Sequence, residues 1–214
     1  MAKKETAMQD RDKYLRFLGP SLGPLYCALY HEVTWLHAKW GQYRILFAQS
    51  QERVELLNRT AGFFFSVIQR ALWEDVVLHI ARLTDPPQSV GKDNLALLRL
   101  AAAVQIPALA SEIESLVNQA QADAKFTREW RNRNLAHLDL DLAMDRATPL
   151  PGISRQNIEQ ALNAIRLVLN RIEGHFFDRE VAFAHFIAHD DAENLLYYLQ
   201  SAVDAEDRET DKWR

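Results

Sequence analysis

The sequence predicts an all-α fold, in the form of an up-down antiparallel helical bundle with an extra helix at the C-terminus. Apolar residues recur every three or four positions over long stretches, which is the periodicity of amphipathic helices. Only 7 glycines and 7 prolines interrupt the 214 residues, so long helices with short connections are favoured, and no stretch has a convincing strand pattern. We expect one domain, residues 1–214, whose polar ends at 1–12 and 205–214 are flexible.

The first expected helices are separated by glycine, proline and a capping serine. In chain order, the expected helices cover residues 13–18, 25–49, 51–83, 94–104, 112–137, 155–173 and 192–204. The first ends where Gly19–Pro20 interrupts the pattern, and Gly23–Pro24 permits a restart because proline is tolerated in a first helical turn. Ser50 is a suitable N-cap for the third helix, which is apolar on more than one face and is therefore expected at the centre of the bundle.

The middle of the chain contains shorter elements. Residues 88–92 are expected to form a loop, after which Asp93 caps a short helix. Ser111 to Glu114 have the pattern of a capping box, which would open the helix that runs to His137. The proline- and aspartate-containing stretch 138–153 is expected to be an ordered loop.

The last helices also have start and stop signals. Ser154 is expected to cap the helix that Gly174 ends, and Asp190 or Asp191 is expected to cap the final helix. Residues 176–189 are compatible with either a short helix or an apolar loop packed on the bundle.

Composition excludes several classes of protein. The net charge of −4 provides no general basic field for nucleic acid, so any such contact requires a local patch. The single cysteine, Cys27, excludes an internal disulfide framework and is expected to lie in the core. No signal-peptide core and no uncharged apolar run of membrane-spanning length is present, so we expect a cytoplasmic protein without membrane contact.

Many aromatic residues lie on the helical stripes. We expect core packing rather than base stacking for this set. Its members are Trp35, Trp40, Tyr43, Phe47, Phe63, Phe64, Phe65 and Trp73.

The densest polar cluster of the chain lies between Lys125 and Asp139. It combines four cations with a histidine where the helix is expected to end: Lys125, Arg128, Arg131, Arg133 and His137. Fixed cations beside a titratable imidazole are the groups that a phosphate-processing site requires. The same cluster is compatible with a solvated helix end, where cations interact favourably with the helix dipole.

Two segments resemble a known family. The segment Arg131-Asn132-Arg133-Asn134-Leu135-Ala136-His137 resembles the arginine, polar residue and histidine motif of HEPN domains, which are helical bundles of ribonucleases and toxins. Trp73 to Asp85, followed by Gly91 to Leu95, resembles the AbiU2-like group of HEPN domains, which is linked to abortive infection in phage defence. The resemblance covers about residues 22–200.

The resemblance implies RNA cleavage without a metal or other cofactor, in a homodimer that places two motifs in one cleft. The 2′-hydroxyl attacks the adjacent phosphate, a histidine acts as acid or base, and an arginine stabilises the developing negative charge. Carried over by position, Arg131 is the cation, Asn132 the polar residue after it and His137 the proton carrier. The candidate RNA-binding residues are Lys125, Arg128, Arg133 and Asn134.

Helix geometry restricts how these side chains can cooperate. On an uninterrupted α-helix, residues six apart point about 120° away from each other and lie about 9 Å apart along the axis. Arg131 and His137 therefore converge only if the helix ends or bends near Ala136, or if a second protomer supplies one of them. Alternatively, Arg133, which shares the face of His137, is the working cation.

Two further groups of polar residues have the spacing of a site. Asp75, His79 and Arg82 lie on one face of the expected central helix, where they would form either a second polar wall of the cleft or a structural charge network. His185 and His189 have a spacing that can bind zinc on a helix, but two ligands are too few for us to predict a metal site.

Two other functions are compatible with the sequence. The first is a non-catalytic, antitoxin-like or regulatory module that binds a protein partner through Leu195, Leu196 and Leu199 of the last helix. The second is a metal-dependent bundle hydrolase. Two His137 side chains around one basic cleft of a homodimer would favour the ribonuclease over the module, and metal analysis of the purified protein would exclude the hydrolase.

Overall fold

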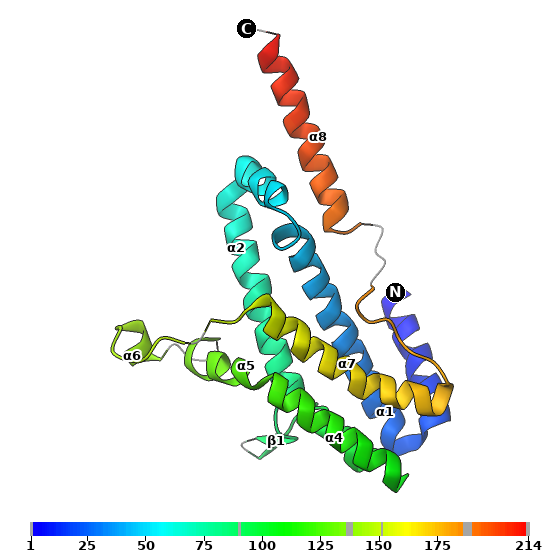
Figure 1. Ribbon diagram of the computed structural model, residues 1–214. Helices are drawn as coiled ribbons and strands as arrows, with labels where there is room; N and C mark the ends of the chain where they lie inside the picture. The colour runs from blue at the N-terminus through cyan, green and yellow to red at the C-terminus, as the bar shows by residue number, and fades with distance from the viewer. Residues whose placement is uncertain (1, 90, 136–138, 151, 186–189, 213–214) are drawn as a thin grey trace. The chain divides into compact units, whose positions relative to one another are not determined.

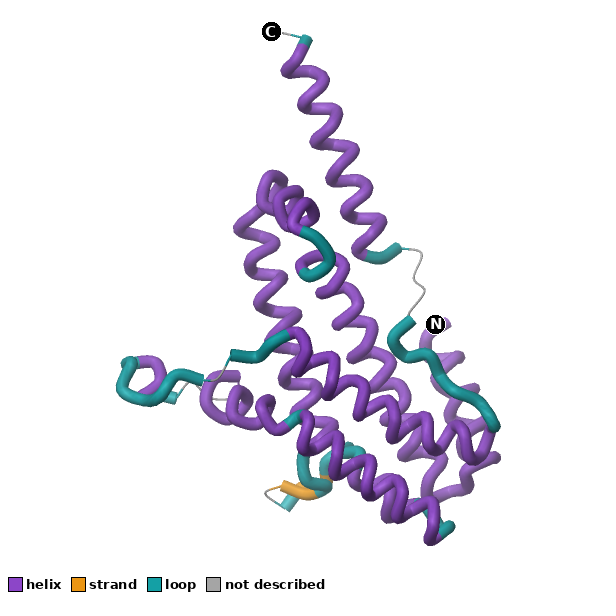
Figure 2. Tube along the Cα trace, in the orientation of Figure 1, coloured by secondary structure: helices purple, strands orange, loops and turns teal. Residues whose placement is uncertain are grey.

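The computed structural model describes residues 2–89, 91–135, 139–150, 152–185 and 190–212. Over these residues the protein is a bundle of helices with one two-stranded antiparallel hairpin (Figure 2). This confirms the predicted all-α fold. The elements are α1 Ala2–Phe47, α2 Gln51–Thr84, β1 Gln88–Ser89, β2 Lys92–Asp93, α3 Leu98–Ala103, α4 Pro107–Asp123, α5 Lys125–Trp130, the π-helical turn η1 Arg131–Leu135, α6 Leu140–Ala143, α7 Arg155–Phe177 and α8 Ala192–Asp211.

The chain forms two compact units. Unit 1 comprises residues 1–36 and 77–183, and unit 2 comprises residues 37–76 and 184–214. Long helices α1 and α2 each contribute to both units. Among the helices of the described residues, none is long and apolar enough to cross a lipid bilayer.

The core of unit 1 includes the contact between α4 and α7 (Figure 1). Helix α3 also packs against α4. The apolar stripe of α4 is buried at Ile113, Val117 and Ala120, as the helical periodicity predicts. Burying one aliphatic side chain contributes about 1.5–3 kcal/mol. This packing therefore holds α4 firmly, and with it the start of the polar cluster that follows α4 in the chain.

Helix α1 reverses at Gly19, where φ is 78° and ψ is 176°. The predicted helix stop at this glycine is confirmed, although the helix before it begins at Ala2, within the stretch expected to be a polar end. The segment before Gly19 folds back, so that the rings of Tyr14 and Tyr26 lie 4.9 Å apart. A Cβ atom at Gly23 would lie 2.5 Å from the Tyr14 carbonyl oxygen, so glycine is required for this close approach.

Helix α7 begins as predicted but ends later. The Ser154 hydroxyl accepts a hydrogen bond from Asn157 N, and the Asn157 side chain accepts one from Ser154 N, which completes a capping box. The predicted stop at Gly174 is wrong, because the helix continues to Phe177 and ends at Asp178, whose φ is 50°. A residue in the left-handed conformation is a usual helix terminator.

A buried carboxylate near the end of α7 connects this helix to α1. Glu173 is fully buried on α7 and accepts hydrogen bonds from Tyr14 Oη at 2.9 Å and Tyr26 Oη at 2.8 Å. Arg179 Nε donates to the other carboxylate oxygen at 2.6 Å. Burial, and next the neighbouring Glu173 charge, raise the pKa of both tyrosines well above the ordinary value. The network fixes the reversed segment of α1 against the end of α7.

Helix α4 corrects two expectations. The predicted capping box is wrong, because α4 begins at Pro107 and Ser111 lies inside it. Proline suits a first helical turn, and the earlier start brings buried Leu109 into the apolar stripe. The single helix expected to reach His137 is instead divided at Ala124 into α4 and the α5–η1 segment, because the Ala124 backbone leaves the helical conformation at ψ 3°.

The connections contain more structure than predicted. The expected loop at 88–92 overlaps the hairpin β1–β2, whose turn includes Gly91 at φ 73°. Asp93 is therefore a strand residue rather than a cap, and the short helix α3 begins only at Leu98. Within the expected loop 138–153, Asp139 caps the short helix α6.

Unit 2 combines the end of α1, most of α2 and α8. Its apolar core is formed by Leu46, Leu57, Phe65, Ala192 and Leu196. The Asp191 side chain accepts hydrogen bonds from two N–H groups of the first turn of α8, which confirms the predicted cap. The helix continues past the expected end at Asp204 to Asp211, and the ion pair between Arg59 and Asp207 supports this extension.

The expectation that the stripe aromatics are buried holds only for part of the set. Trp40 and Phe65 are buried, and so is Cys27, as predicted. Phe63 is 87% exposed, and Trp35 and Phe64 are each 57% exposed, so core packing is wrong for these three. For the two phenylalanines the reason is the interruption of α2 at Ala61, where φ is −154° and ψ is 58°, because it shifts the phase of the stripe.

Candidate functional site

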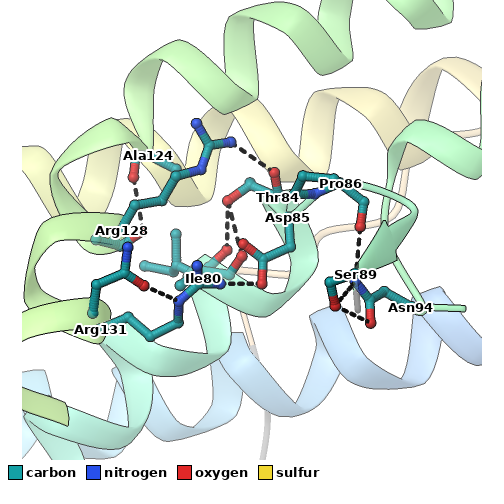
Figure 3. Close-up of polar contacts among 12 residues, drawn as sticks. Ile80, Thr84, Asp85, Pro86, Ser89, Asn94, Ala124, Arg128 and Arg131 are labelled. Carbon is teal, nitrogen blue, oxygen red and sulfur yellow. Dashed lines mark hydrogen bonds and ion pairs between the residues drawn. The ribbon is translucent and has the colours of Figure 1, made fainter. Parts of the chain in front are cut away.

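Arg131 is held at the end of α2. Helix α5 continues into the π-helical turn η1, which begins at Arg131. Arg131 Nη1 donates a hydrogen bond to Oδ2 of Asp85, the residue that follows the end of α2 (Figure 3). The side chains of Arg131 and Asp85 are 25% and 15% exposed. Arg131 Nε also donates to the exposed Asn132 at 3.1 Å. The guanidinium is therefore oriented by a carboxylate but still reaches solvent.

The last carbonyl of α2 fixes the neighbouring helices. Thr84 O accepts a hydrogen bond from Arg128 Nη2 at 2.9 Å (Figure 3). It also accepts one from Gln121 Nε2 at 3.1 Å. A helix C-terminus leaves carbonyl groups without intrahelical partners, and positively charged donors satisfy them well. Arg128 therefore has a structural role here, and it lies beside Arg131 at the same helix end.

The helical run through the motif is not uniform. Residues Arg131–Leu135 form the π-helical turn η1, a feature that is frequent at functional sites. Asp139 N donates to Arg133 O at 3.0 Å, and Arg133 Nε lies 3.5 Å from Asp139 Oδ2. The hydrogen bond from Leu142 N is the main cause that lowers the pKa of Asp139. The 120° separation calculated for a regular α-helix therefore does not apply to this segment.

The predicted catalytic set is partly described. Arg131 and Asn132 are in contact, whereas His137 lies outside the described residues, so its convergence with Arg131 stays a prediction. Among the predicted RNA contacts, Lys125 is exposed and Asn134 is partly buried. The structure thus brings Arg128 and Arg131 to one helix end and pairs Arg133 with a different carboxylate.

The second group of predicted residues is divided. His79 and Arg82 meet Glu32 of α1, with 2.8 Å between His79 Nε2 and Glu32 Oε2 and 4.0 Å between Arg82 Nη2 and the same oxygen. Asp75 belongs to unit 2 and forms an ion pair with Lys39.

His79, Arg82 and Glu32 line an open polar pocket of about 440 Å³ in unit 1. Its lining residues are Glu32, His79, Arg82, Leu83, Asp85, Asp93, Asn94 and Leu95. Asp85 belongs both to this pocket and to the ion pair with Arg131, so the candidate cation and the pocket share one carboxylate. His79 and Arg82 line this pocket and also pair with Glu32 of α1, so the choice between a second polar wall and a structural charge network stays a prediction.

Sequence reasoning missed Glu32 and Asp85 as site residues. Asp85 ends the Trp73 to Asp85 segment that resembles the family, but next to Pro86 it was interpreted only as a helix stop. Glu32 lies on an amphipathic helix, and nothing in its neighbourhood distinguishes it from other exposed carboxylates. Both become site residues because distant segments pack together, which a motif search along the chain does not detect.

The described residues do not form a metal site. Among them, no group of three or more histidine, cysteine, aspartate or glutamate side chains has a suitable arrangement. His185 is exposed, and His189 lies outside the described residues.

An all-α chain that presents an arginine and a polar residue at a helix end, with a histidine six positions after the arginine, has the features of a HEPN domain. The family model HEPN_AbiU2, described as AbiU2, matches residues 20–195, and the chain therefore belongs to the AbiU2 family of HEPN domains. This confirms the resemblance inferred from the sequence. No curated protein and no solved structure matches the chain.

Proposed function

We propose that this protein is a metal-independent endoribonuclease of the HEPN type, acting as an RNA-cleaving effector in phage defence. The observation that carries the proposal is Arg131, which Asp85 holds at the end of α2, partly exposed, in a chain of the AbiU2 family. The family relates the protein to abortive infection, and the arginine supplies a fixed positive charge of the kind that phosphoryl chemistry needs.

In the proposed reaction, the ribose 2′-oxygen forms a bond to the adjacent phosphorus and the bond to the 5′-oxygen breaks. The products are a 2′,3′-cyclic phosphate and a 5′-hydroxyl. One group must accept the proton of the 2′-hydroxyl, and another must donate a proton to the leaving oxygen. One imidazole cannot be in both states at once, so a homodimer with two His137 side chains in one cleft would provide both. Arg131 would stabilise the additional negative charge on the phosphate.

Electrostatics predicts selective rather than general RNA binding. The net charge is −4, and Asp85 already compensates the charge of Arg131. Lys125, Arg128 and Arg133 would add a local positive surface, and Asn134 would add a neutral hydrogen-bonding group. Binding to generic RNA should still be weak and should decrease with salt.

The test is incubation of the purified protein with bulk RNA or tRNA in the presence of EDTA. We expect products with cyclic phosphate ends from the wild type and none from His137→Ala or Arg131→Ala. Arg166→Ala is the matched control, because Arg166 is a partly exposed cation of α7 whose guanidinium donates hydrogen bonds to the nearby Asn163. Equal products from the wild type and His137→Ala would refute the enzymatic proposal.

A second candidate function is a non-catalytic, antitoxin-like interaction module. It is favoured by the exposed side chains of Tyr197, Tyr198 and Leu195 on α8. Leu196 is buried in the core of unit 2 and Leu199 is partly buried, so these two predicted contacts serve the protein's own fold. Light scattering would separate the candidates, because a monomer that binds RNA or protein without cleavage supports the module.

A further inference from the structure

We propose that the polar pocket beside Arg131 binds a nucleobase of the RNA, and that it prefers a base whose edge donates hydrogen bonds, guanine above all. The inference rests on the proposed function, because it takes RNA as the ligand. It adds a base-recognition subsite, lined by Glu32, Asp85 and Asp93, to a site whose predicted residues otherwise address the phosphate.

The charge of the pocket selects the class of ligand group. Its lining includes three carboxylates, Glu32, Asp85 and Asp93, but only one guanidinium, that of Arg82. Each carboxylate already has a partner, so the described lining offers a phosphate no uncompensated cation, while its carboxylate oxygens can still accept hydrogen bonds. Ionised carboxylates only accept hydrogen bonds, so the fitting group is one that donates them.

One acceptor in the pocket lacks a partner within the described part of the chain. Asp85 Oδ2 accepts from Arg131, whereas Oδ1 of the same carboxylate is buried and accepts no hydrogen bond from the described residues. A buried acceptor without a donor costs about 1–3 kcal/mol, so such atoms are rare without a functional reason. Oδ1 has almost no solvent-accessible surface, so a ligand N–H group would satisfy it after the Asp85 carboxylate rotates toward the pocket that it lines.

The remaining lining residues suit a flat aromatic ring. Leu95 is exposed and supplies apolar surface, and the side chain of Arg82 is 56% exposed, so its planar guanidinium is available to stack on a base. A volume of about 440 Å³ lies within the range of small-ligand pockets, about 300–1,000 Å³. The pocket therefore combines polar groups for a base edge with apolar groups for a base face.

The wall of the pocket is built rigidly. The Asn94 side chain donates to Pro86 O at 2.9 Å and Ser89 Oγ at 3.0 Å, which closes the hairpin β1–β2 (Figure 3). Arg99 Nε donates to Asn94 O at 2.6 Å, and Arg99 Nη2 donates to Asp93 at 2.6 Å. These contacts position the Asp93 carboxylate before any ligand binds, which reduces the entropic cost of binding.

The chemistry of the bases leads to guanine. Guanine presents adjacent N1–H and N2–H donors, which one carboxylate can accept with both oxygens. Adenine and cytosine present one amino group each, and uracil presents a single N–H between two carbonyl oxygens that the carboxylates would repel. Because Asp85 touches both the pocket and Arg131, a base bound here would lie next to the phosphate that Arg131 contacts.

The experiment measures binding without cleavage. In the His137→Ala background, fluorescence polarisation compares a uridine decamer with the same decamer containing one central guanosine. We expect the guanosine decamer to bind about tenfold more tightly, which is within the 1–3 kcal/mol that one bidentate base contact provides. Glu32→Gln and Asp93→Asn should each reduce this ratio toward one, whereas Glu112→Gln, which removes a carboxylate paired with Arg171 outside the pocket, should not change it.

The outcomes separate this inference from the proposed function. Equal affinity for the two decamers, or a preference that persists in both pocket variants, would overturn the pocket inference even if the wild type cleaves RNA. Guanosine preference that depends on the pocket, in a protein that cleaves no RNA, would support the pocket and refute the nuclease. Asp93 is mostly exposed, so Asp93→Asn remains informative if Glu32→Gln fails to fold.

Discussion

Replacing Asp85 with asparagine separates the two roles of its carboxylate, holding Arg131 and compensating its charge. The Arg131–Asp85 pair is about four-fifths buried. Breaking a fully buried pair costs about 3–5 kcal/mol, and an exposed pair is worth about 0–1 kcal/mol. With solvent access taken into account, we expect Asp85→Asn to lower the free energy of unfolding by about 2 kcal/mol, measured by urea denaturation followed by circular dichroism.

The same substitution should weaken the fold but strengthen the binding of RNA at low salt. Without its carboxylate, Arg131 becomes one additional uncompensated cation at the site. For single-stranded RNA, each neutralised phosphate contributes about −0.7 to the slope of log K against log salt. Binding of the His137→Ala, Asp85→Asn variant should therefore be tighter at low salt, with a slope steeper by about 0.7. In the Asp85→Asn single variant, which keeps His137, the rate of RNA cleavage should fall because Arg131 is no longer oriented.

The matched control is Asp207→Asn, which breaks another arginine–aspartate pair but lies on the exposed surface of α8. It changes the net charge equally, and it should alter neither the salt slope nor, appreciably, the stability. If Asp85→Asn leaves the salt slope unchanged and lowers cleavage no more than Asp207→Asn, Arg131 does not contact RNA phosphate and the reasoning is wrong.

Three further predictions concern the fold that carries the site. Glu173→Gln should destabilise the protein by about 2–4 kcal/mol in urea denaturation, because it removes the buried charge that Arg179 and two tyrosines stabilise, and a change below about 0.5 kcal/mol would contradict this. Because burial raises the pKa of Tyr14 and Tyr26, both stay protonated in the fold while they ionise in the unfolded chain near the ordinary tyrosine value of about 10. The free energy of unfolding, measured by urea denaturation, should therefore keep its full tyrosine contribution below that pH and decrease above it. Tyr26→Phe should weaken this decrease, and an unchanged alkaline pH profile in Tyr26→Phe would refute the role given to Tyr26. Gly23→Ala should cost about 1–3 kcal/mol, because its Cβ would meet the Tyr14 backbone, and unaltered urea denaturation would show that the reversed segment of α1 is not held there.

Helix ends were predictable where the signal is a side chain that caps its own helix. Ser154 and Asp191 both make the hydrogen bonds that their positions predict. The start of α4 was not predictable in this way, because Pro107 and the apparent capping box at Ser111 are competing local signals. Tertiary packing decides between them, since burial of Leu109 favours the earlier start.

The candidate site was predictable from the sequence only for residues that belong to one continuous segment. Arg131 and Asn132 belong to one continuous motif, which the sequence displays directly. Asp85 follows the end of α2 and Glu32 lies on α1, and their contribution depends on the packing of unit 1. Asp75 and His79 lie one turn apart on α2, but their partners, Lys39 and Glu32, are set by the packing against α1, which the sequence does not display.

For the proposed reaction, we infer that Arg131 rather than Arg133 is the working cation. Both arginines have a carboxylate partner, so pairing alone does not distinguish them. Asp85 follows the end of α2, whose last carbonyl is also bound by Arg128 and Gln121, so Arg131 is oriented against a fixed helix terminus. Asp139 is already occupied as the cap of α6, and its nearest contact with Arg133 is 3.5 Å. A cation that stabilises a transition state acts best when it is oriented before the reaction begins, and Arg131 meets this condition better.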